Sequence, residues 1–109
     1  MTELIPHLLD LLQPLGAVRD RRMFGGYGLY LGDLMFGLVA DDTLYFKVDA
    51  DSEGDYQELG LACFSYLRQG PPVKIRSFRQ APAEALELGE ELCRRAGRAV
   101  QAARRSRKV

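Results

Sequence analysis

The segment RMFGGYGLYLGDLMFGLVADDTLYFKV, residues 22–48, decides the fold class. Aromatic and branched residues dominate it, and their spacing of two is typical of strands. We expect three strands, at residues 22–31, 34–40 and 43–48. Two-residue gaps, Gly32-Asp33 and Asp41-Asp42, separate them, which indicates tight hairpins; glycine in the first position suits a type II′ turn. The segment therefore predicts a three-stranded antiparallel meander.

The two turns fix an expected register. Leu31 would pair with Leu34, Gly28 would lie opposite Gly37, and Gly37 would lie opposite Phe46. One face of the sheet then carries Phe24, Gly26, Gly28, Tyr30, Met35, Gly37, Val39, Leu44, Phe46 and Val48. Its glycines would form a shallow trough in which a helix approaches the backbone closely, with a bulge as the alternative explanation of Gly25-Gly26.

The opposite face is expected to be a protein contact surface. In the same register it carries Tyr27, Leu29, Leu31, Leu34, Phe36 and Leu38, followed by Thr43, Tyr45 and Lys47. Such a face is too apolar to be left in water. An uncovered apolar patch of this size usually marks an interaction site. We expect a homodimer, or a monomer whose sheet binds another protein, with Phe36 near the centre of the contact.

Helices flank the meander. Leucines at helical spacing predict a helix over residues 3–14, stopped at Pro14-Leu15-Gly16. A short helix is expected over residues 51–59, ended by Gly60. Strands follow within residues 61–67 and 73–78, joined by a turn at 68–72, and residues 81–105 close the chain as helix with a break near Gly89. A stripe of mostly small residues in it, Leu92, Ala96, Ala99 and Ala103, predicts close packing.

These elements predict an α+β protein, a two-layer α/β sandwich with the order α-β-β-β-α-β-β-α. At 109 residues the chain is expected to be a single domain, 1–109, whose tail at 104–109 frays.

Charge is distributed unevenly although the formal net charge is zero. Residues 33–58 contain eight acids and one base, whereas residues 94–108 contain seven bases and no acid. The basic set is a candidate nucleic-acid contact: Arg94, Arg95, Arg98, Arg104, Arg105, Arg107 and Lys108. It lacks interleaved aromatic residues and a helix-turn-helix pattern, so a solvated helix end matched to its dipole is the more frequent explanation.

Catalytic and cofactor sites are not expected. Gly26-Tyr27-Gly28 leads into another strand rather than a helix, which excludes a dinucleotide phosphate loop. His7 has no partner at metal-ligand spacing, and Cys63 and Cys93 read as two reduced thiols. No Ser, Cys or His is placed with a base. The N-terminus resembles no secretory signal, so we expect a cytoplasmic protein without metal, cofactor or enzymatic activity, and no membrane contact.

The segment RRMFGGYGLYLGDLMFGLVADDTLYFKVD, residues 21–49, closely resembles the signature of the TfoX/Sxy N-terminal domain. That signature begins Arg-x-Met-Phe-Gly-Gly-x-Gly and ends in a Leu-Tyr-x-Lys-Val-Asp strand. The resemblance continues through Gly60, Phe64-x-Tyr66 and Pro82-x-Glu84-Ala85-Leu86, so it covers nearly the whole chain. It departs at Cys63, where the family often has proline, and in lacking the family's helical C-terminal domain.

The resemblance implies a two-layer fold of the secretion-chaperone type and a bacterial regulatory role. Well-known members switch on competence genes together with the cyclic-AMP receptor protein. The implied function is a stand-alone, non-enzymatic regulatory or adaptor domain that contacts the transcription machinery, with a regulator of the cyclic-AMP receptor type as the expected partner. The alternative is direct, weakly specific nucleic-acid binding through the C-terminal arginines. The family supplies no catalytic residues to carry over.

Overall fold

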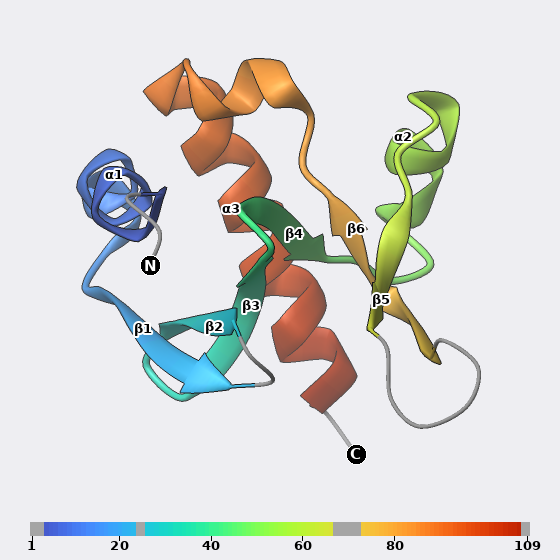
Figure 1. The fold of residues 1–109 in the computed structure, drawn as a ribbon, viewed down its shortest axis with the longest axis horizontal. Helices are drawn as coiled ribbons and strands as arrows, with labels where there is room; N and C mark the ends of the chain where they lie inside the picture. Colours follow the sequence, from blue (N-terminus) through green and yellow to red (C-terminus); the bar gives the residue numbers. More distant parts are fainter. Residues whose placement is uncertain (1–3, 24–25, 67–72, 108–109) are drawn as a thin grey trace.

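The computed structural model describes residues 4–23, 26–66 and 73–107. The chain begins and ends in helices, which pack against an antiparallel sheet (Figure 1). In chain order the elements are α1 (Leu4–Leu11), the 3₁₀ helix η1 (Gln13–Leu15), β1 (Val18–Met23), β2 (Gly26–Leu31), β3 (Leu34–Ala40), β4 (Thr43–Lys47), α2 (Glu53–Glu58), β5 (Cys63–Tyr66), β6 (Val73–Gln80), the 3₁₀ helix η2 (Ala83–Leu86) and α3 (Gly89–Arg107). The expected α+β class is confirmed.

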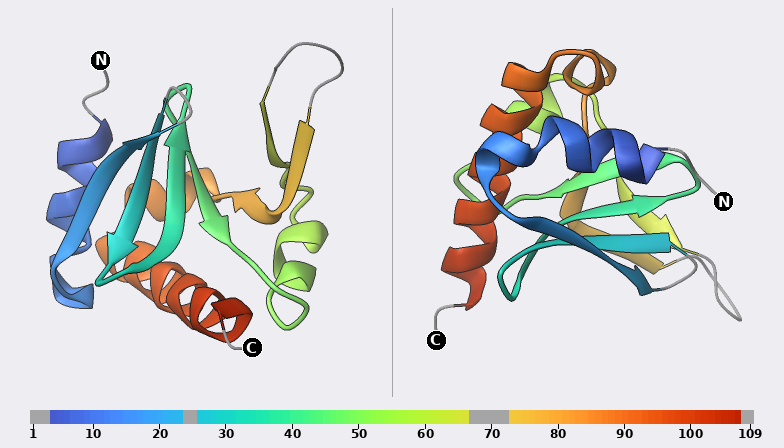
Figure 2. Two further views of the ribbon diagram at one scale, coloured as in Figure 1. Left: turned by 90° about the horizontal axis from the view of Figure 1, so that it is seen from below. Right: turned by 90° about the vertical axis from the view of Figure 1, so that its left-hand side faces the viewer.

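The sheet has six described strands in the order β1-β2-β3-β4-β6-β5, with antiparallel neighbours throughout. The additional strand is β1, which begins at Val18 where no strand was expected; only its last two residues fall within the expected strand at 22–31, most of which is β2. The expected turn at 68–72 lies outside the described residues. Figure 2 shows α1 and α3 on the same side of the sheet, where their apolar side chains enter one core.

Both expected hairpins of the meander are present. Leu31 pairs with Leu34 around Gly32, whose φ of +63° favours glycine. Ala40 pairs with Thr43 around Asp41 and Asp42, which both have positive φ, +55° and +58°. Positive φ at both central residues is the pattern of a type I′ hairpin turn.

The register of the first hairpin differs from the expectation. Tyr30 pairs with Met35 but Leu29 pairs with Gly37, so Phe36 is an extra residue in β3. This β-bulge places Gly28 opposite Leu38 rather than opposite Gly37. The expected pairing of Gly37 with Phe46 is confirmed.

The bulge changes which residues share a face, so the expected division into two faces was wrong. Leu29 and Phe36 belong to the same core as Val39, Leu44 and Phe46. A smaller cluster on the other face of the sheet contains Leu38, Phe64 and Phe78, with Met35, Ala40 and Tyr45 packed against it. The glycines are divided too, because Gly28 pairs with Leu38 while Gly37 pairs with Leu29.

The last helix packs as the small-residue stripe predicted. Its members are all buried, from Leu92 and Ala96 at 0% exposure to Ala103 at 6%. The expected break near Gly89 is confirmed, since η2 ends at Leu86 and α3 begins at Gly89. The expected fraying from residue 104 is not seen, because α3 continues to Arg107 and Arg105 is held by an ion pair with Asp49. Lys108 and Val109 lie outside the described residues.

Candidate interaction surfaces

The contact face expected from the sequence is not a free surface. Leu29 and Phe36 are fully buried and Leu38 is 2% exposed. Tyr27, Leu31 and Leu34 are half-buried and pack against the main core. The expectation was wrong because the bulge at Phe36 turns the first part of this hairpin toward the helices. Leu29, Phe36 and Leu38 are therefore not available for contact with another protein.

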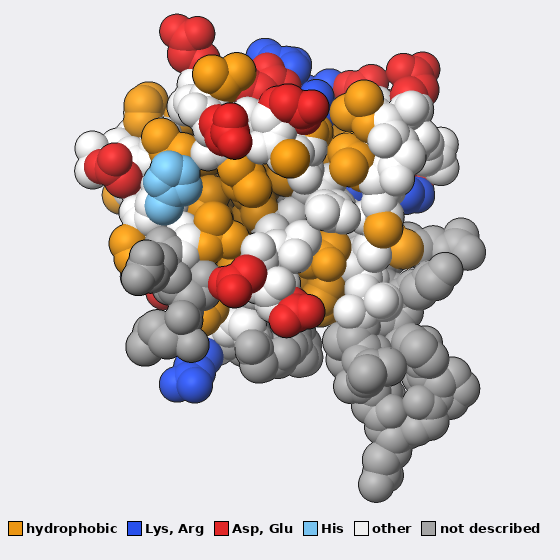
Figure 3. Space-filling model, turned by 45° about the horizontal axis from the view of Figure 1, so that its top comes forward, with side chains coloured by type: hydrophobic (Ala, Val, Ile, Leu, Met, Phe, Trp, Pro, Cys, Tyr) orange, Lys and Arg blue, Asp and Glu red, His pale blue; other side chains and the backbone are white. Residues whose placement is uncertain are grey.

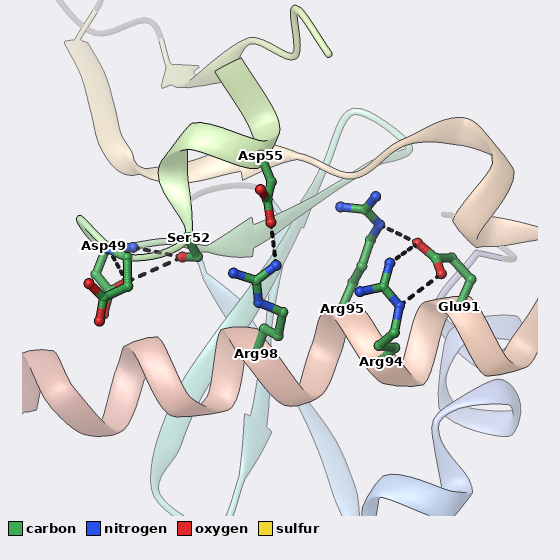
Figure 4. A network of polar contacts seen from close by, with 8 residues as sticks. Asp49, Ser52, Asp55, Glu91, Arg94, Arg95 and Arg98 are labelled. Carbon is green, nitrogen blue, oxygen red and sulfur yellow. Dashed lines mark hydrogen bonds and ion pairs between the residues drawn. The ribbon is translucent and has the colours of Figure 1, made fainter. Parts of the chain in front are cut away.

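The arginines of α3 instead meet acids of the same chain (Figure 4). Arg94 and Arg95, three and four residues after Glu91 in the helix, each lie 2.7 Å from its carboxylate. Arg98 pairs with Asp55 of α2. Four of the seven candidate nucleic-acid residues are paired in this way once Arg105 is included, whose Nε lies 2.6 Å from Asp49 Oδ2.

A turn and the short helix α2 position the acids that meet Arg98 and Arg105. Ser52 is the N-cap of α2 and is buried, and its hydroxyl accepts a hydrogen bond from the backbone N–H of Asp49 at 3.1 Å. Asp49 Oδ1 in turn accepts hydrogen bonds from the Ser52 hydroxyl and the Asp51 N–H. The carboxylate is therefore held in one orientation, with Oδ2 directed toward Arg105.

These contacts change the acid–base behaviour of both partners. The hydrogen bond from Arg105 is the main cause that lowers the pKa of Asp49 below its ordinary value. Likewise, the hydrogen bond from Arg94 lowers the pKa of Glu91. Arg95 also lies over the ring of Tyr56, 5.5 Å from its centroid. Arg98, Arg105 and the Arg95–Tyr56 contact thus hold α2 and the preceding turn against α3, whereas the pairs with Glu91 lie within α3 itself.

The remaining members of the basic set differ in status. Arg104 is exposed, and within the described residues it has no ion pair. The side chain of Arg107 and the whole of Lys108 lie outside what the structure describes. The uneven charge of the sequence therefore has an internal explanation: the acidic segment packs beside the basic helix.

A second basic surface was missed by the sequence reasoning. Strand β1 carries Arg19, Arg21 and Arg22, all exposed, and one acid, Asp20. None of these arginines forms an ion pair within the described part of the chain; Arg19 only donates a long hydrogen bond, 3.4 Å, to the carbonyl oxygen of Gly32. The signal was the spacing of two between Arg19 and Arg21, which a strand places on one face.

No arrangement typical of a metal site is found among the described residues, where no three His, Cys, Asp or Glu side chains gather. The His7 Nε2–H donates to the carbonyl oxygen of Leu86 at 3.1 Å and so connects α1 to η2. The Cys93 thiol donates to the carbonyl oxygen of Leu11. Cys63 and Cys93 are both free. Within the described helices there is no stretch long and apolar enough to cross a bilayer.

Acidic side chains surround the hydrophobic centre of the face shown in Figure 3, and basic side chains appear at its margins. Several residues of the segment that resembles the family signature lie in the main core, among them Leu29, Phe36, Leu44 and Phe46. Residues 10–103 match the family model of the TfoX N-terminal domain, which is most of the chain. The chain belongs to the TfoX N-terminal domain family.

The family match agrees with a curated relative. The chain is 29% identical over 97 residues to "DNA transformation protein TfoX1" of Aliivibrio fischeri. The match covers 84% of this chain and 46% of the relative, so the chain spans about half the length of the protein it matches. The region that the family model matches, residues 10–103, contains the sheet, α2 and most of α3. Neither description names an enzymatic activity.

Proposed function

We propose that this chain is a regulatory adaptor domain that acts in DNA uptake by contacting a protein of the transcription machinery. The match to the TfoX N-terminal domain over residues 10–103 carries the proposal. The relative in Aliivibrio fischeri is named a DNA transformation protein, which supports a role in competence. The expected partner is a transcription regulator of the cyclic-AMP receptor type, and the expected compartment is the cytoplasm.

The geometry favours protein contact over the alternative, direct nucleic-acid binding by α3. A helix that binds DNA presents its arginines to phosphates. Here Arg94, Arg95, Arg98 and Arg105 already contact carboxylates of the same chain. Each phosphate contact would have to replace one of these ion pairs, which reduces the gain from binding.

The proposal is tested in the source organism by deleting the gene and measuring transformation frequency together with transcripts of DNA-uptake genes. We expect both to fall, and both to return when the intact gene is restored. In parallel, the purified chain is tested for binding to the purified cyclic-AMP receptor protein with and without cyclic AMP. Unchanged transformation and transcripts in the deletion strain would contradict the role in DNA uptake. If deletion lowers transformation and the transcripts but the purified proteins do not bind, the role in DNA uptake stands and the cyclic-AMP receptor protein is excluded as the partner.

A further inference from the structure

Strand β1 forms one margin of the sheet. In the strand order β1 has a neighbour on one side only, β2, so its other edge is not paired with a strand among the described residues. The right-hand view of Figure 2 shows β1 along this margin, below α1. Such an edge presents backbone N–H and C=O groups that another extended chain can pair with.

The side chains of β1 add a charge preference to this edge. Arg19 and Arg21 alternate with Asp20, so they share one face of the strand, and their neighbours in β2 are Tyr30 and Gly28. A surface hollow borders the strand, lined by Arg19, Asp20, Arg21, Tyr30, Gly32 and Asp33. Unlike Arg94, Arg95, Arg98 and Arg105 of α3, the arginines of β1 form no ion pair within the described chain.

We infer that β1 is a docking edge for an acidic extended segment of a partner protein, which adds to the sheet as a further strand. Its backbone would pair with β1, and carboxylates at alternate positions would face Arg19 and Arg21. Opposite charges directly across two strands stabilise the pairing. The other margin, β5, has four described residues against six in β1, and none of those four is basic.

A second copy of the chain is a poor occupant of the same edge. Each copy of β1 carries three arginines and one acid, so pairing two copies would bring two strands of net positive charge together. The net repulsion between them opposes self-pairing, whereas an acidic segment is attracted to the same edge. Nucleic acid is also a poorer match, because it cannot pair with the backbone edge.

This inference rests on the proposed function only in taking a protein as the partner. The test uses the purified chain and a synthetic peptide in which Glu alternates with Val and Thr. Binding is measured by nuclear magnetic resonance titration. Amide hydrogen exchange, with and without the peptide, then shows which backbone N–H groups of the chain become protected. We expect shifts and new protection to concentrate in β1, over Val18–Met23.

Three matched controls separate strand addition from simple charge attraction. We expect Arg21→Glu to weaken the affinity about threefold to tenfold. Arg104→Glu, the same charge change on an exposed arginine of α3, should leave the affinity unchanged. The same peptide with methylated backbone nitrogens keeps its charge but loses its donors, and we expect it not to bind.

Several outcomes would overturn the inference. They are no binding of the acidic peptide, equal binding of the methylated peptide, shifts that map to α3, or equal protection of β1 by a duplex oligonucleotide. None of these outcomes bears on whether deletion of the gene lowers transformation, so a failure of the docking edge is distinguishable from a failure of the proposed function.

Discussion

Among the glycines whose surroundings the structure describes, Gly26 leaves the least space for a side chain. A Cβ at this position would lie 2.2 Å from the backbone carbonyl oxygen of Val39 in the neighbouring strand. That oxygen belongs to the sheet itself, so it cannot move aside without disturbing the pairing of β2 with β3. Gly37 is also confined, because a Cβ added at Gly37 would lie 3.3 Å from Leu29 Cδ1.

We therefore expect Gly26→Ala to lower the free energy of unfolding by about 3 kcal/mol, at the upper end of what overpacking costs. Gly97→Ala is the matched control, because a Cβ there meets nothing within 4 Å and alanine favours a helix by about 1 kcal/mol over glycine. Urea denaturation gives both values. A midpoint for Gly26→Ala equal to that of the wild type would mean that the strands lie farther apart than described.

Phe36 tests the assignment of faces. Its ring is fully buried and stacks on Phe46, with centroids 6.5 Å apart. We expect Phe36→Ala to cost about 3–5 kcal/mol and Phe36→Glu to prevent folding, because the charge would be buried without a partner. Circular dichroism shows whether the Phe36→Glu protein is folded. The control is Leu59→Glu, which should fold, because Leu59 is 55% exposed. A folded and stable Phe36→Glu protein would mean that Phe36 is exposed and belongs to a contact surface after all.

At the scale of elements, α2 and the turn before it depend on charged contacts with α3. Because Arg105 lowers the pKa of Asp49, the pair stabilises the folded state where Asp49 is ionised. This contribution is complete above the ordinary aspartate pKa, near 4, and is lost as the pH falls through the lower value in the folded protein.

We expect Asp49→Asn to destabilise the protein at pH 7 and to reduce the difference in unfolding free energy between pH 7 and pH 2.5. Asparagine keeps an acceptor for the Asp51 N–H and the Ser52 hydroxyl, so the substitution removes mainly the charge. The measurement is urea denaturation at several pH values. An Asp49→Asn protein with the same pH dependence as the wild type would show that the ion pair contributes nothing to the acid sensitivity.

Element by element, the sequence predicted what local chemistry determines. The turn at Gly32-Asp33, the helix end at Gly60 (φ +70°) and the break before Gly89 follow from residues close in the chain. Strand β1 was not predicted as a strand of its own, because VRDRRM has charges where a buried strand has apolar residues. A strand at the edge of a sheet does not need apolar residues at every position, because part of it faces solvent.

The bulge and the ion pairs could not be predicted for a different reason. Phe36 fits equally well into a regular strand, and only packing against both Phe46 and the helices selects the bulged register. The pairs of Arg98 with Asp55 and of Arg105 with Asp49 join residues far apart in the chain. The opposite charges of the two segments were visible in the sequence, but not that they face each other.

At the scale of the whole molecule, two basic regions differ in their availability. Arg94, Arg95, Arg98 and Arg105 of α3 are paired with internal acids, whereas Arg19, Arg21 and Arg22 of β1 form no ion pair within the described residues. The formal net charge of zero conceals this arrangement. Because of this arrangement, the acids beside α3 compete with any approaching polyanion for the arginines of the helix.

We expect the wild-type chain to bind duplex DNA weakly, without sequence preference, and less as salt rises. Asp49→Asn combined with Asp55→Asn should strengthen this binding about tenfold at low salt, because Arg98 and Arg105 become available. Glu84→Gln with Glu87→Gln is the control, with the same charge change on exposed residues of the η2 region. Fluorescence anisotropy provides the affinities. Tight, salt-tolerant and sequence-specific binding by the wild type would instead favour nucleic-acid recognition.

The extra residue at Phe36 makes chain length in this hairpin as consequential as residue identity. Deleting Phe36 would leave Leu29 opposite Gly37 and Gly37 opposite Phe46, so the register would become regular and these residues would keep their faces. The deletion would remove the buried ring of Phe36 without exchanging inside for outside, whereas deleting a regularly paired residue such as Val39 would shift the strand by one position against its neighbours. Across aligned relatives, single-residue gaps within β3 should therefore occur at Phe36 more often than at its other positions. A deep mutational scan that includes deletions would reveal the same asymmetry within this one chain.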